Sequence, residues 1–237
     1  MRRVRLPALL LLACAFLAPS PSFAATPPES EVLADRMLDA VGGRARWAAL
    51  RNTVNDSLQF RLEEPFVVRS VIRMDFTQPR FRIDTTAPGL VLARVVDGER
   101  HWRLSRAGSV TDLPADILAD DRRWYAGHVY RTIHRVAARD PALRLAVSAS
   151  GRLEVHEGPA RIAWFALDAR GEPYAFGAHD DDVGSISGPW NFVRDGIRHP
   201  AWVARPDGNW RAAVQALEVN VKLEDADFAR PAAPAVR

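Results

Sequence analysis

The sequence predicts a mainly β protein with helices, in which an antiparallel sheet of about eleven strands is accompanied by an N-terminal and a central helix. Two observations predict this class. From residue 54 onward the hydrophobic period is two, and turn-forming groups such as "TQPR", "APG", "DGE" and "AGS" recur about every 8 to 12 residues, as in an antiparallel meander. Two stretches interrupt this rhythm with helical spacing.

The first helical stretch is "ESEVLADRMLDAVGG", whose apolar residues fall on one side and which ends at Gly42-Gly43, a typical C-terminal glycine signal. A shorter helical segment, 44–50, follows it. The central stretch runs from Asp112, a possible N-cap, to Asp140-Pro141, where a proline ends the helix. Gly127 in its middle costs about 1 kcal/mol relative to alanine, so a bend or break is allowed there.

Strands are expected on both sides of the central helix. Before it, residues 54–62 alternate apolar and polar side chains, 66–76 continue the pattern, and the recurring turns divide the rest. After it, strands are predicted at 143–147, 153–156, 162–167, 174–176, 190–193, 197–204 and 210–223.

The chain begins like an exported bacterial protein. Three arginines precede an apolar run from Ala8 to Ala18, and Ser22 and Ala24 occupy the positions that a signal peptidase reads, so residues 1–24 are predicted to be a signal peptide. The alternative is a lipobox, "LLAC", in which Cys14 would be lipidated and would anchor the protein to a membrane. We expect a short linker at 25–29, a single domain at 30–231 and a flexible tail at 232–237.

Charge argues against a nucleic-acid partner. The signal peptide holds three of the 32 basic residues and no acidic ones, so its removal leaves 29 basic residues against 29 acidic ones. Nucleic-acid-binding proteins normally show a concentrated basic face. Cys14 is the one cysteine, so the processed chain would have no disulfide and its fold would depend on burial of apolar surface.

Several segments together resemble the outer-membrane lipoprotein-sorting (LolA/LolB-like) superfamily of periplasmic proteins. They are the Gly42-Gly43 helix end, the hairpin "DGERHW", the later "RDGIRHP", and the ending "VNVKLEDADFARP". The resemblance implies an incomplete antiparallel barrel closed on one side by helices, with a concave face that holds acyl chains or other apolar ligands. The dedicated lipoprotein carriers of this superfamily also use an arginine inside the cavity, which the sequence does not identify here.

On this basis, seven aromatic residues on predicted strands are candidate ligand contacts. An acyl chain of about fourteen methylenes, at about 0.8 kcal/mol each, could gain on the order of 11 kcal/mol before ordering costs, so no charged anchor is required. An ordinary hydrophobic core is the competing interpretation for each of them. The candidates are Phe60, Phe76, Phe81, Trp102, Trp164, Trp190 and Trp202.

Candidate catalytic or metal-binding residues are few. His101 is expected on a hairpin with a two-residue turn, on the same face as Arg103 and opposite Trp102, which favours an ordinary surface histidine. "HDDD" at 179–182 groups carboxylates that suit a hard cation, but it lacks the spacing of an EF-hand. "GSISG" at 184–188 has Ile186 where a nucleophile elbow has serine. We therefore expect no catalytic residue, no metal and no cofactor.

The sequence favours a non-enzymatic periplasmic protein that binds a lipid, an acyl chain or a lipoprotein, with transient membrane contact unless Cys14 is lipidated. The first alternative is a ligand-free interaction or scaffold module of the same fold that binds other envelope proteins. The second is an enzyme that uses a metal at Asp180–Asp182 together with a histidine.

Overall fold

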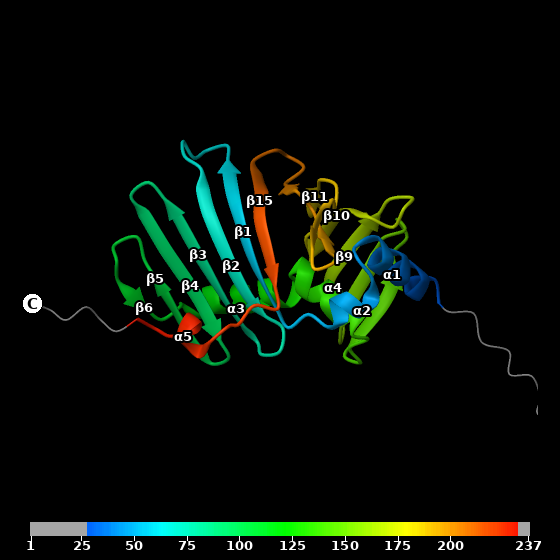
Figure 1. Cartoon of the computed structure of the whole chain (residues 1–237), viewed down its shortest axis with the longest axis horizontal. Helices are drawn as coiled ribbons and strands as arrows, with labels where there is room; N and C mark the ends of the chain where they lie inside the picture. The colour runs from blue at the N-terminus through cyan, green and yellow to red at the C-terminus, as the bar shows by residue number, and fades with distance from the viewer. Residues whose placement is uncertain (1–27, 232–237) are drawn as a thin grey trace, which may run out of the picture.

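The computed structural model describes residues 28–231. The signal peptide, Cys14, most of the expected linker and the tail 232–237 lie outside these residues. Fifteen strands lie within the described part of the chain, and thirteen of them form one antiparallel sheet in the order β6-β5-β4-β3-β2-β1-β15-β14-β11-β10-β9-β8-β7. Because β6 and β7 lie at opposite ends of this order, the sheet is not closed into a barrel, which confirms the predicted incomplete barrel (Figure 1).

The first half of the sheet is a meander of β1 (Asn52–Arg61), β2 (Val68–Asp75), β3 (Arg80–Ala87), β4 (Leu90–Asp97), β5 (Arg100–Leu104) and β6 (Val110–Thr111). The predicted period of two and the predicted turns are both confirmed. The hairpin between β4 and β5 has the expected two-residue turn, since Asp97 pairs with Arg100 and Gly98 has a φ of 60°.

The second half contains β7 (Leu143–Val147), β8 (Leu153–Glu157), β9 (Ala160–Leu167), β10 (Pro173–Ala178), β11 (Ser185–Ser187), β14 (Trp202–Ala204) and β15 (Trp210–Val219). β12 (Phe192–Arg194) and β13 (Ile197–His199) form a separate hairpin. β15 pairs with β1, which joins the two halves of the chain. The strand expected at 197–204 is two strands, because Pro200 falls between β13 and β14 and proline cannot donate to a sheet ladder.

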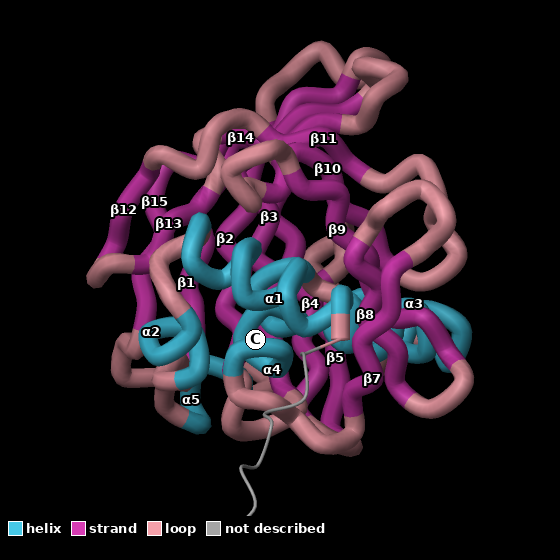
Figure 2. The backbone as a smooth tube through the Cα atoms, turned by 90° about the vertical axis from the view of Figure 1, so that its right-hand side faces the viewer, coloured by secondary structure: helices cyan, strands magenta, loops and turns pink. Residues whose placement is uncertain are grey.

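The N-terminal helices α1 (Glu29–Ala40) and α2 (Arg44–Ala48) are confirmed where the sequence predicts them. The predicted central helix is two helices, α3 (Ala115–Gly127) and α4 (Val129–Ala137), which meet at His128. The N-terminal helices lie beside α4 (Figure 2). Asp112 does not cap α3: the N-cap position is Pro114, and the Asp112 carboxylate instead pairs with Arg230 at 2.5 Å. A short helix, α5 (Asp225–Phe228), follows β15 and was not predicted.

The helices divide the buried apolar residues into separate clusters. α1, α2 and α4 cover one cluster over β8, β9 and β15, which includes Trp47, Ile133 and Phe165. α3 packs through Tyr125 on Met74, Phe81 and Val96 of β2, β3 and β4. On the opposite face of the same strands, α5 packs through Phe228 on Val95 and Trp102. The face under α3 is therefore the inner, concave one, and the face under α5 is the outer one.

Candidate functional site

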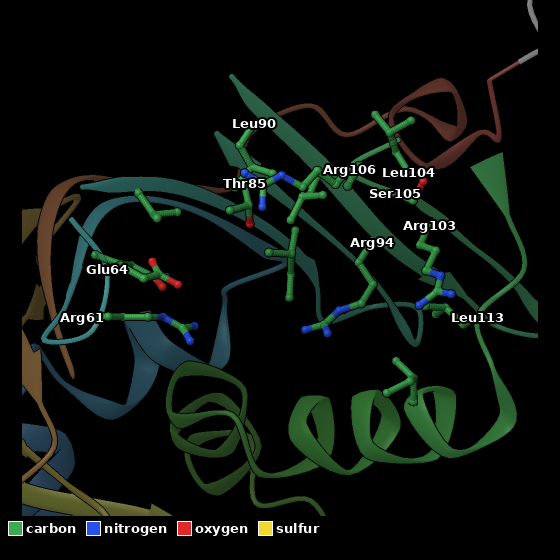
Figure 3. Close-up of a pocket in the computed structure, with 16 residues that line it drawn as sticks. Arg61, Glu64, Thr85, Leu90, Arg94, Arg103, Leu104, Ser105, Arg106 and Leu113 are labelled. Carbon is green, nitrogen blue, oxygen red and sulfur yellow. The ribbon is translucent and has the colours of Figure 1, made fainter. Parts of the chain in front are cut away.

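The candidate site is the inner face of the sheet where α3 and α4 leave it uncovered. Two cavities of about 640 and 490 Å³ lie there, and five residues, Gln59, Arg61, Ile83, Thr85 and Arg94, line both. The two cavities therefore form one continuous groove, which we call the concave groove. Figure 3 shows its larger cavity, with strands on one side, a helix on the other and side chains pointing into the space between them.

Strand alternation decides which residues line the groove. Directly paired residues point to the same face, so Ser57, Ser70, Thr85 and Leu92 form one row across β1, β2, β3 and β4. All four line the groove. The next row is Asn55, Ile72, Ile83, Arg94 and Arg103, and it lines the groove too.

The larger cavity has an apolar floor, and charged side chains point into it (Figure 3). Its apolar residues come from β2 to β5, from the loop before α3 and from α3, and its charged residues are four arginines and one glutamate. The apolar set is Val68, Ile83, Leu90, Leu92, Ala93, Leu104, Leu113 and Ile117, and the charged set is Arg61, Arg94, Arg103, Arg106 and Glu64.

The smaller cavity continues beneath the junction of α3 and α4 and across β10, β14 and β15. Trp124, Val129, Phe176, Trp210 and Val214 supply much of its apolar surface. Asn55 contributes a buried Oδ1 atom that has no hydrogen-bond partner among the described residues. A buried amide oxygen without a donor costs free energy, so a ligand or water that donates a hydrogen bond here would be stabilised.

His128 lies at the helix junction and lines the smaller cavity. Its Nδ1 atom accepts a hydrogen bond from the backbone N–H of Tyr130 at 3.3 Å, so it caps the N-terminus of α4. Burial, and to a smaller extent the charge of Arg131, lowers the pKa of His128 from 6.5 to about 4. The ring is therefore neutral at neutral pH and can accept this hydrogen bond.

An ion pair connects the sheet to α3 inside the groove. Arg94 Nε lies 3.1 Å from Asp121 Oδ2, and the Asp121 side chain is 4% exposed whereas that of Arg94 is 42% exposed. Burial raises the pKa of Asp121, although the charge of Arg94 opposes this shift. Neither of the two facing atoms has a hydrogen bond of good geometry among the described residues.

None of the seven predicted aromatic contacts is among the residues that line the two cavities. Three lie on the outer face: Phe60 is 43% exposed, Trp102 donates through Nε1 to the Phe228 carbonyl at 3.0 Å, and Trp202 lies under the Arg211 guanidinium. Arg152 lies over the ring of Trp164, which is almost fully buried.

The other three aromatic candidates belong to the core. Phe76 stacks on His134, Phe81 stacks on Tyr125, and Trp190 donates through Nε1 to the Pro173 carbonyl at 2.7 Å. Trp190 precedes β12 and does not lie on a strand. Ligand contact by any of the seven stays a prediction. The residues that line the groove were missed because the candidates were selected by residue type and not by strand face.

The other sequence candidates have structural partners. His101 is half-buried on the inner face, where its Nδ1 accepts from the Leu113 N–H at 3.1 Å, so it links β5 to the loop before α3 and is not the expected surface residue. In "HDDD", Asp181 pairs with Arg205 and Asp182 with Arg161, each at 2.6 Å. Within residues 28–231 no group of three or more histidine, cysteine or acidic residues could hold a metal ion. "GSISG" contains β11.

Comparisons with known proteins find only solved structures that are distantly similar to this one. No family model and no curated protein matches the sequence. A DUF1329 family protein from Desulfovibrio piger is 10% identical with a TM-score of 0.40, over 84% of this chain and 95% of that one. An uncharacterized conserved protein from Thermus thermophilus is 10% identical with a TM-score of 0.39, over 88% and 96%. MucB is 13% identical with a TM-score of 0.28, over 86% and 63%. At these scores the fold assignment rests on the strand order described above.

Proposed function

We propose that this protein is a non-enzymatic binding protein of the cell envelope that holds a lipid, an acyl chain or a lipid-modified partner in the concave groove. The observation that carries the proposal is the open inner face, where cavities of about 640 and 490 Å³ lie between the strands and the helices α3 and α4. Small-molecule sites typically have volumes of about 300 to 1,000 Å³ and are lined mostly by apolar groups.

The energetics of burial support an apolar ligand. Each methylene removed from water contributes about 0.8 kcal/mol, so an acyl chain laid along Ile83, Leu92 and Ile117 gains affinity in proportion to its buried length. Part of this gain offsets the loss of translational freedom and the ordering of the chain. The groove needs no rearrangement of the sheet to accept such a ligand, because its apolar floor already faces an open space.

The envelope location is supported by the predicted signal peptide, which lies outside the described residues. Within residues 28–231, no helix is long and apolar enough to cross a membrane.

Filling the groove tests the proposal. Thr85 lines both cavities, so a Thr85→Trp substitution places an indole where the ligand would lie. We expect the affinity of the delipidated protein for a fluorescent acyl probe to fall by about ten-fold or more, which corresponds to about 1.4 kcal/mol. The measurement is a fluorescence titration of wild type and variant.

Thr86→Trp is the matched control, because Thr86 is the neighbouring residue of β3, is exposed and points to the other face. It should bind the probe like the wild type. Equal affinity of all three proteins would place the ligand outside the groove. Uptake of no probe by the wild type would contradict the proposal and favour the ligand-free interaction module.

A further inference from the structure

Two arginines of the concave groove stand directly opposite each other on neighbouring strands. Arg94 of β4 pairs with Arg103 of β5, and both line the larger cavity. Side chains at directly opposed positions have Cβ atoms about 4.5 to 5.5 Å apart, and like charges there are destabilising. The fold thus holds two cations together on its inner face at a cost in stability.

The sheet neutralises a similar pair elsewhere. On the outer face, Arg73 of β2 stands opposite Arg82 of β3, and Asp84 contacts both of them, at 2.6 and 2.8 Å. In the groove, Arg94 has Asp121, but Arg103 reaches only the Thr111 hydroxyl, at 3.5 Å. On the outer face, one acidic residue, Asp84, therefore neutralises both arginines of the pair. In the groove, no acidic side chain among the described residues pairs with Arg103.

Further cations point into the same cavity. Figure 3 shows Arg61, Arg94 and Arg103 directed into the space between the strands and the helix, with Glu64 beside Arg61. Among the described residues, no hydrogen bond or ion pair engages the guanidinium of Arg61 or that of Arg106. Among the described residues that line this cavity, Glu64 is the one acidic side chain beside the four arginines.

We infer that the ligand of the groove is an amphiphile with an anionic head group, a phosphate or a carboxylate, which the Arg103 guanidinium binds next to Arg94 while the chain lies on the apolar floor. This inference rests on the proposed function and narrows its ligand class. Arginine suits both anions because its planar fork can donate two parallel hydrogen bonds. The amphiphile supplies the negative charge that the pair Arg94 and Arg103 lacks.

The test compares ligands that share one chain and differ in the head group. Isothermal titration of the delipidated protein with dodecyl phosphate, dodecanoate and dodecanol should show both anions binding about ten-fold or more tighter than the alcohol, as about 1.4 kcal/mol from charge-assisted hydrogen bonds requires. This preference should weaken as salt is added, because the Arg103 side chain is exposed and its charge is screened.

Arg103→Gln should remove most of the preference for the anions and weaken dodecanol binding far less. Arg144→Gln is the matched control, because Arg144 is exposed on β7 at the far end of the sheet order and its loss changes the net charge equally. It should keep the preference. Thermal unfolding of the two variants checks that each one folds.

The outcomes separate this inference from the proposed function. Equal binding of the alcohol and the anions, unaffected by Arg103→Gln, would overturn the anionic head group and leave lipid binding intact. Binding of none of the three ligands would overturn both. Inorganic phosphate that binds as tightly as dodecyl phosphate would also overturn the inference, because the site would then take a free anion and not an amphiphile.

Discussion

At the scale of single residues, His128 connects the groove to the stability of the fold. The ring caps α4, lines the smaller cavity and contacts Trp124 and Tyr130 edge-on. Its pKa is about 4 in the folded protein, below the ordinary value of 6.5, mainly because burial disfavours the charged ring. Between these two pH values the unfolded chain binds more protons than the folded one, so stability falls as the pH falls through this window.

We predict that replacing His128 with asparagine makes the protein less sensitive to acid. Asparagine is a good N-cap, so the α4 cap is kept while the titrating group is lost. Between about pH 7 and pH 4, protonation linked to His128 should lower the free energy of unfolding of the wild type by at most about 3 kcal/mol. The variant should not show this loss. The measurement is the free energy of unfolding in urea at a series of pH values.

His134 and His199 also make the protein less stable in acid, because burial lowers the pKa of each of them. The His128→Asn variant keeps both histidines, so its stability should still fall with pH, but less steeply than that of the wild type. A variant whose stability falls with pH as steeply as that of the wild type would contradict the assignment of His128.

At the scale of elements, the junction of α3 and α4 depends on a close contact between Gly127 and the sheet. Gly127 ends α3, and a Cβ atom built there would lie 2.4 Å from the Ile162 carbonyl oxygen and 2.8 Å from the Ala178 Cβ. The glycine therefore lets the helix approach β9 and β10 closely. The sequence allowed a break at this residue from helix propensity alone, but the close contact of Gly127 is with strands far away in the chain, which the propensity does not show.

We predict that Gly127→Ala destabilises the protein, although alanine is the better helix former by about 1 kcal/mol. The added methyl group overpacks the contact with β9, and such changes typically cost about 1 to 3 kcal/mol. Urea unfolding measures the change. Ala119→Gly, at an exposed site of the same helix, gives the propensity effect alone and should cost about 1 kcal/mol. A more stable Gly127→Ala variant would contradict this account of the junction.

The elements that the sequence predicts best are those with a long, regular period. β1 to β5, β7 and α1 follow directly from alternation or helical spacing. The misses are short: β11 has three residues inside "GSISG", and α5 has four. These elements depend on partners distant in sequence, such as the pairing of Ile186 with Ala204 and the packing of Phe228 on Trp102, which local periodicity does not encode.

At the scale of the whole molecule, the groove depends on which face each strand turns inward. Alternation predicted that His101 and Arg103 share a face opposite Trp102, and the structure confirms this. The sequence did not show which of the two faces is concave, because that depends on α3 and α5 covering opposite sides of the same strands. This missing information explains why aromatic residues were chosen as candidates and the row from Ile83 through Arg94 to Arg103 was not.

The central claim is that the concave groove holds an amphiphile, and native mass spectrometry of the protein purified without detergent from the periplasm of a Gram-negative host tests it most directly. The claim predicts a bound mass that solvent extraction releases as a lipid, that carries a negative charge and that is lost from the Thr85→Trp variant but kept by Thr86→Trp. A wild-type protein that carries no lipid and takes none up after incubation with dodecyl phosphate would contradict it.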